Sequence, residues 1–124
     1  GKQIPEESNQ ITLDDDILSV FHDDQYVGLA YKSGKEKQPY EIALYTTGGR
    51  EKATFTLDFA FDHVAISKDQ IFVYNEKEVG IYTVKGYCRY RGTIKEGNVE
   101  NIFRLSGNRY MVVLDSGTET IRLQ

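Results

Sequence analysis

Five aspartates within eleven positions form the densest acidic cluster of the sequence. Hard cations such as Ca²⁺ bind several carboxylate and carbonyl oxygens, so the cluster has the atom types of a metal-binding loop. The alternating D-x-D-x-D-G pattern of calcium loops is absent, however. Because aspartate accepts hydrogen bonds from backbone amides in turns, we interpret these residues as turn residues and predict no metal site. The five are Asp14, Asp15, Asp16, Asp23 and Asp24.

Two histidines and one cysteine are the other candidates for catalysis or metal binding: His22, His63 and Cys88. Zinc requires three or four nitrogen or sulfur ligands, and these three residues come from different predicted strands. A cysteine nucleophile requires an open, electropositive pocket, to which Arg89 and Arg91 would contribute. We expect Cys88 instead to pack against a neighbouring sheet. The common phosphate-binding, nucleophile-elbow and zinc-protease motifs are absent. We therefore predict no catalytic, cofactor-binding or metal residue.

Two further segments could contact a partner. Residues 87–91, YCRYR, interleave aromatic and basic groups as single-strand nucleic-acid platforms do. The net charge of −4 and the pI near 5.2 indicate a surface that repels phosphate backbones, so we interpret the segment as a solvated strand face and exclude nucleic acid. Residues 32–39, with three lysines and one glutamate, form a predicted hairpin tip. It is either a partner contact or a tolerated insertion, and we favour the insertion.

The composition indicates which elements must position these side chains. The chain has 124 residues with nine Tyr, six Phe and no Trp, and hydrophobic residues make up 40%. Plentiful Tyr, Thr, Ile, Val and Phe favour strands. Residues 1–9 are polar without periodicity, which is typical of a tail or linker. Residues 10–124 are predicted to form a single all-β domain of short strands separated by turns, with strands over residues 17–22, 26–31, 40–46, 53–57, 63–67, 71–74, 79–84, 90–94, 102–105, 110–114 and 120–123.

One short phrase occurs twice, as IALYTTGG (residues 42–49) and VGIYTVKG (residues 79–86), 37 positions apart. The preceding strands match at an offset of 45, which places eight extra residues in the first copy, in residues 32–39. A period near 40 with four strands per repeat is typical of propeller blades, which stack because one sheet cannot bury its own faces. The apolar runs at residues 71–74 and 111–114 predict strands covered on both faces.

The repeated phrase resembles the third-strand-and-turn signature of β-propeller repeats of the YVTN, quinoprotein-like and WD40-like kind, over residues 10–124. The chain is also similar to uncharacterised bacterial surface or membrane-anchored propeller domains. The resemblance implies about three four-stranded antiparallel blades. An antiparallel β-sandwich or barrel is the alternative. The resemblance to propeller repeats further implies a non-enzymatic binding module with a protein or glycan partner, outside the cytoplasm. A second hypothesis makes the chain a fragment of a larger propeller hydrolase or lyase whose catalytic residues lie elsewhere.

The sequence also yields two expectations about membranes and assembly. No run of about 18 apolar residues occurs, so we predict no membrane span in this chain, and an anchor could lie in a removed segment. Closed propellers typically have about four to eight blades, so three blades leave apolar faces open. We therefore predict a homodimer closing a six-blade ring, in which residues 11–13 of one copy pair with residues 120–123 of the other.

Overall fold

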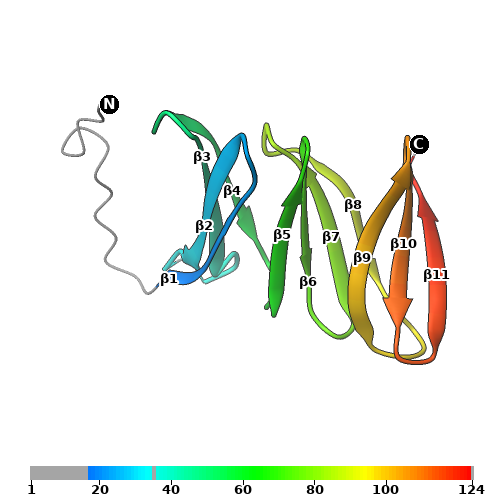
Figure 1. Cartoon of the computed structure of the whole chain (residues 1–124). Coiled ribbons are helices and arrows are strands. Elements are labelled where there is room, and N and C mark those ends of the chain that lie inside the picture. Colours follow the sequence, from blue (N-terminus) through cyan, green and yellow to red (C-terminus); the bar gives the residue numbers. More distant parts are fainter. Residues whose placement is uncertain (1–16, 35, 124) are drawn as a thin grey trace. The chain divides into compact units, whose positions relative to one another are not determined.

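The computed structural model describes residues 17–34 and 36–123, which form eleven strands and no helix (Figure 1). The strands make three antiparallel sheets, each built from consecutive strands. Sheet A contains β1 (Ile17–His22), β2 (Tyr26–Lys32), β3 (Tyr40–Thr46) and β4 (Glu51–Leu57). Sheet B contains β5 (His63–Ser67), β6 (Gln70–Tyr74), β7 (Glu78–Thr83) and β8 (Cys88–Thr93). Sheet C contains β9 (Val99–Ser106), β10 (Arg109–Leu114) and β11 (Gly117–Arg122).

The predicted all-β class and the division into three blade-like sheets are confirmed, with one difference in the strand count. Sheets A and B have four strands, and sheet C has three among the described residues. The predicted strand at residues 11–13 lies outside the described residues. The described part of the chain divides into two compact units, residues 17–60 with 84–86 and residues 61–83 with 87–123. Sheet A belongs to the first unit, and sheets B and C belong to the second.

The repeated phrase builds the same hairpin in sheets A and B. The backbone N–H of Thr46 donates to the carbonyl of Arg50 at 2.8 Å, and its hydroxyl accepts the Arg50 N–H at 3.2 Å. Thr83 makes both bonds with Tyr87, at 2.8 and 3.2 Å. A β-bulge lies next to each turn at the same place in the pairing. The phrase recurs because its threonine satisfies the backbone groups that close this turn.

Strand pairing corrects the offset inferred from the sequence. Thr46 pairs with Tyr26, and Thr83, the same position of the phrase, pairs with Gln70. Tyr26 therefore corresponds to Gln70 at an offset of 44, one less than the sequence match of 45. The connection between β2 and β3 thus carries seven extra residues and not eight. This one-residue error matters, because a shift of one moves every side chain of a strand to the opposite face.

The glycine that ends each phrase has a backbone conformation that other residues adopt at a cost. Gly49 and Gly86 have φ of 88° and 96°. We expect Gly86→Ala to lower the free energy of unfolding by about 1 kcal/mol, because an L side chain strains this left-handed conformation. A Cβ at Gly86 would lie no nearer than 3.7 Å to other atoms, so the cost is backbone strain and not a clash. Urea denaturation of the purified variant measures this.

Gly48 is the matched control, because it lies in the first copy of the turn without a left-handed φ. A Cβ there would come no closer than 3.8 Å to its neighbour, Thr46 Oγ1. We expect Gly48→Ala to change stability by less than about 0.5 kcal/mol. Equal losses in Gly48→Ala and Gly86→Ala would show that the φ angle does not determine the effect.

Side chains from sheets B and C together form the hydrophobic core of the second unit. In β10, alternate residues point into this core. The predicted burial of Ile71, Val73, Val112 and Leu114 is confirmed, at 0, 0, 0 and 8% exposure. The core consists of Phe72, Tyr74, Val79, Ile81, Ile94, Val99, Ile102, Tyr110, Val112, Leu114, Ile121 and Leu123.

The two strands predicted to be covered on both faces differ from each other. Every residue of β6 is buried, as predicted. In β10 burial alternates instead, and Met111 and Val113 are partly exposed. The prediction was wrong for β10 because an apolar run reports hydrophobicity alone, and no described residue covers the second face of sheet C.

Candidate functional site

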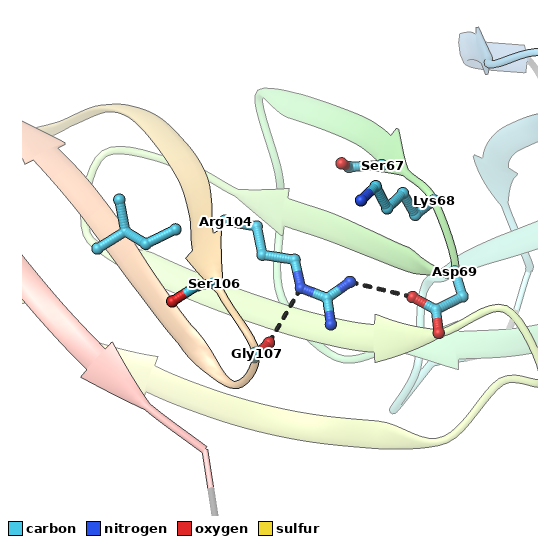
Figure 2. Close-up of a pocket in the computed structure, with 7 residues that line it drawn as sticks. Ser67, Lys68, Asp69, Arg104, Ser106 and Gly107 are labelled. Atoms are coloured by element: carbon cyan, nitrogen blue, oxygen red, sulfur yellow. Dashed lines mark hydrogen bonds and ion pairs between the residues drawn. The ribbon is translucent and has the colours of Figure 1, made fainter.

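Two turns of the second unit line a half-open pocket of about 450 Å³ (Figure 2). One is the turn between β5 and β6, and the other is the turn between β9 and β10. Both turns follow the first strand of their sheet, so they are equivalent positions of two consecutive repeats. The pocket is lined by Ser67, Lys68, Asp69, Arg104, Leu105, Ser106 and Gly107.

The β5–β6 turn contains a strained residue. Ser67 pairs with Gln70, so the turn has only two central residues, Lys68 and Asp69. Lys68 has a φ of 57°, and it is the only described non-glycine residue with a positive φ. A left-handed conformation is uncommon for a long side chain, and such residues concentrate at functional sites.

The other side of the pocket is formed by a β-bulge at the end of β9. Arg104 pairs with Tyr110 and Ser106 pairs with Arg109, so Leu105 is an extra residue in the strand. Bulges change the direction of neighbouring side chains. Here the bulge leaves Arg104 on the face that carries Tyr110, which is turned toward sheet B.

Polar contacts hold the Arg104 guanidinium at the pocket wall. Its Nη1 donates to Asp69 Oδ1 at 3.2 Å, and its Nε donates to the carbonyl of Gly107 at 3.1 Å, as the dashed lines in Figure 2 show. Its Cζ lies 5.9 Å from the centre of the Tyr110 ring, within cation–π range. The side chain of Arg104 is 27% exposed and that of Asp69 is 70% exposed. Because Asp69 is well solvated, the ion pair orients the guanidinium and adds little stability.

A buried hydrogen bond fixes Tyr110, the residue whose ring contacts the Arg104 guanidinium. The hydroxyl of Tyr110 donates to the side-chain oxygen of Gln70, which is 4% exposed. Burial raises the pKa of Tyr110 above its ordinary value, so the hydroxyl keeps its proton and remains a donor. The Tyr110 ring also meets Phe72 edge to face, with ring centres 5.7 Å apart. The platform under Arg104 is therefore fixed by both packing and hydrogen bonding.

The chemistry of the pocket is that of an anion-binding site. It contains two cations, Lys68 and Arg104, one carboxylate, Asp69, and the hydroxyls of Ser67 and Ser106. The Lys68 ammonium makes no hydrogen bond or ion pair with another described residue. Among residues 17–34 and 36–123, no group of three or more His, Cys, Asp or Glu side chains has the arrangement of a metal site.

One of the aspartates identified in the sequence, Asp23, caps a turn. Asp23 Oδ1 accepts the backbone N–H groups of Gln25 and Tyr26 at 2.8 and 2.9 Å. The turn interpretation is thus confirmed for Asp23. Asp14, Asp15 and Asp16 lie outside the described residues.

The two histidines belong to different sheets, His22 to sheet A and His63 to sheet B. His22 is exposed at the end of β1. His63 begins β5, and its ring lies 5.1 Å from that of Tyr74 in a tilted arrangement. Neither histidine lines the pocket.

Cys88 is exposed, so the prediction that it packs against a neighbouring sheet was wrong. Regular alternation along residues 87–91 would place Cys88 and Tyr90 on one face. In the structure Tyr90 pairs with Ile81 and Cys88 pairs with Tyr82, because a bulge adds a residue between them. Cys88 and Tyr90 therefore lie on opposite faces, and only Tyr90 packs against the core.

The two arginines beside Cys88 are exposed, as predicted for a solvated strand face. Arg91 donates to Glu78 Oε2 at 2.8 Å within sheet B. This hydrogen bond holds the pKa of the Glu78 carboxyl below its ordinary value. Arg91 is therefore part of a surface ion pair between neighbouring strands.

The residues of the pocket were not recognised from the sequence. An ungapped match of residues 105–106 with residues 66–67 aligns Leu105 with Ile66. Strand pairing instead places Arg104 at that position, because Arg104 pairs with Tyr110 as Ile66 pairs with Ile71. An arginine at a position that is apolar in the preceding repeat is the signal that could have identified the site. The bulge hid this signal, because the extra residue Leu105 shifts the alignment of the two repeats by one position.

Solved structures share the fold at low sequence identity. The computationally designed Ika4 protein matches with a TM-score of 0.58 and 12% identity, over 87% of this chain and 66% of that chain. The computationally designed Ika8 protein matches with a TM-score of 0.60 and 13% identity, over 86% of this chain and 33% of that one. HIRA(644-1017) matches with a TM-score of 0.62 and 12% identity, over 86% and 34%. With the three blade-like sheets, these likenesses identify a propeller-like fold.

The remaining findings concern membrane-spanning helices in the structure and matches of the sequence to curated proteins and family models. The part of the chain that the structure describes contains no helix with the length and apolar character needed to span a bilayer. No curated protein matches the chain in sequence. A family model does match residues 1–123, and the chain accordingly belongs to DUF5711, a family of unknown function.

Proposed function

We propose that the chain is a non-enzymatic interaction module that binds another β-sheet through the open side of sheet C. The observation that carries the proposal is an apolar face of sheet C that no described residue covers. Phe103 is 50% exposed, and Met111 and Val113 of the neighbouring strand β10 are partly exposed. Met111 pairs with Phe103, so the two side chains share one face of sheet C.

The corresponding face of sheet B is covered by sheet C, so two repeats of the same chain can be compared. The turns before β6 and β10 have equivalent pairings, Ser67 with Gln70 and Ser106 with Arg109. Phe72 of sheet B therefore corresponds to Met111 of sheet C. Phe72 is 3% exposed and belongs to the core formed with sheet C. The position that meets a neighbouring sheet in one repeat is thus partly exposed in the next, where no described residue covers it.

The edge strand of sheet C favours a partner that contributes a β-strand, rather than a glycan. Among the strands that the structure describes, β11 occupies the edge of its sheet, whereas the equivalent strand β7 pairs with β8. An unpaired edge strand offers its backbone groups to an added strand. The matched region also makes up about a third of two of the solved structures that share the fold, at 33% and 34%. Such sheets therefore occur within longer chains.

We take the partner to be a second copy of the chain, with residues 11–13 pairing along residues 120–123. The alternation Ile11-Thr12-Leu13 supports this, because it has the period of a half-buried strand. We also propose that the repeats are related to the YVTN and quinoprotein-like types, on the basis of the hairpin built by the repeated phrase.

Sedimentation of the purified chain tests this proposal. We expect self-association that increases with concentration. Phe103→Ser should weaken it by about tenfold or more, since loss of an aromatic anchor from an interface costs about 2 kcal/mol. Tyr87→Ser is the matched control, because Tyr87 is an aromatic residue of the same unit with 68% exposure. A 14.2 kDa monomer at high concentration would rule out the second copy as the partner.

A further inference from the structure

We propose that the pocket between the β5–β6 and β9–β10 turns binds a carboxylate group, with Lys68 and Arg104 as its two cationic ligands. The proposal is independent of self-association through sheet C. It concerns a small ligand or a terminal group that enters the pocket of Figure 2.

Arg104 is oriented before a ligand arrives. Its Nε and Nη1 are engaged by Gly107 and Asp69, and the ring of Tyr110 lies within cation–π range. A guanidinium has five N–H donors, and the described contacts use two of them. The remaining donors belong to a group that is already fixed in place, so little side-chain entropy is lost when they bind an oxygen.

Lys68 contributes the second positive charge, and its backbone indicates why a lysine at this position is unusual. Glycine would adopt the φ of 57° without strain. A lysine adopts this left-handed conformation at a cost in backbone free energy, and Lys68 is one of the residues that line the pocket. Strained residues of this kind are typical of binding sites that the surrounding structure maintains.

The charge balance favours a carboxylate over a phosphate. Lys68 and Arg104 are opposed by Asp69, so the pocket has a formal charge of +1. A carboxylate matches this charge, whereas a phosphate near neutral pH brings up to two negative charges close to Asp69. The hydroxyls of Ser67 and Ser106 can donate to either oxygen of a carboxylate. The volume of about 450 Å³ lies within the range of small-molecule sites.

Amide and guanidinium chemical shifts, measured by nuclear magnetic resonance on the folded chain, test the proposal with acetate as the probe. We expect saturable shifts at Lys68, Ser106 and the Arg104 Nε–Hε group, with weak affinity suited to so small a ligand. Inorganic phosphate at the same ionic strength is the second probe, and it should bind more weakly. Phosphate binding more tightly than acetate would overturn the choice of carboxylate.

Variants assign the binding to the pocket. Lys68→Gln should raise the acetate dissociation constant about tenfold, the effect of losing one charge-assisted hydrogen bond. Lys37→Gln removes an exposed lysine on sheet A's β2–β3 connection and should leave the constant unchanged. Arg104→Lys keeps the positive charge but removes the planar set of guanidinium N–H donors, and it should also weaken acetate binding. Equal effects of Lys68→Gln and Lys37→Gln, or no saturable shift in the unmodified chain, would overturn the proposal. Self-association through sheet C would be unaffected by these results.

Discussion

Replacing Ile81 with alanine is expected to lower the free energy of unfolding by about 3 kcal/mol. Ile81 is 0% exposed and lies in the core shared by sheets B and C. Its strand neighbours are Phe72 and Tyr90, which also contact this core. Truncation removes the transfer free energy of three carbons and leaves a cavity that packed β-sheets cannot close. Equilibrium unfolding in urea, followed by circular dichroism, measures the loss.

Ile17→Ala is the matched control, because the same three carbons are removed from a side chain that is 53% exposed. We expect this variant to change stability by less than about 0.5 kcal/mol. Similar losses in the two variants would mean that the core lies elsewhere, or that the exposed strand β1 contributes to a cooperative unit. A change in the urea dependence without a change in midpoint would indicate an altered unfolded state instead.

The strands were predictable because short-range chemistry determines them. The expected segments 17–22, 40–46 and 63–67 coincide with β1, β3 and β5. Turn residues separate the apolar runs, and Asp23 and the glycines of the repeated phrase act within a few residues of their own positions. Such local signals need no knowledge of the fold.

The pocket could not be predicted, because it depends on bulges and on contacts between distant residues. The sequence period of two assigns faces correctly only while pairing is regular. One bulge separates the faces of Cys88 and Tyr90, and another aligns Arg104 with Ile66. The ion pair that orients Arg104 joins residues 35 positions apart. These features arise when two sheets pack, and no single segment encodes them.

Tyr110→Phe is expected to destabilise the chain by about 1–3 kcal/mol, although it removes only one oxygen. Tyr110 is 0% exposed, and its hydroxyl donates to the side-chain oxygen of Gln70, which is also buried. Without that donor the amide oxygen of Gln70 remains away from water and without this partner. Tyr87→Phe, at a position that is 68% exposed, should have almost no effect on the urea midpoint.

A double-mutant cycle with Gln70→Leu separates this loss from a change in packing. When both polar partners are replaced by apolar groups of similar size, no buried acceptor is left, and the pair can be nearly neutral. We therefore expect the double variant to be more stable than the sum of the single losses predicts, by about 1 kcal/mol. Strict additivity would show that the hydroxyl and the amide do not interact. In that case the platform beneath Arg104 would be held by the packing of Tyr110 against Phe72 alone, and acetate binding should then survive Tyr110→Phe unchanged.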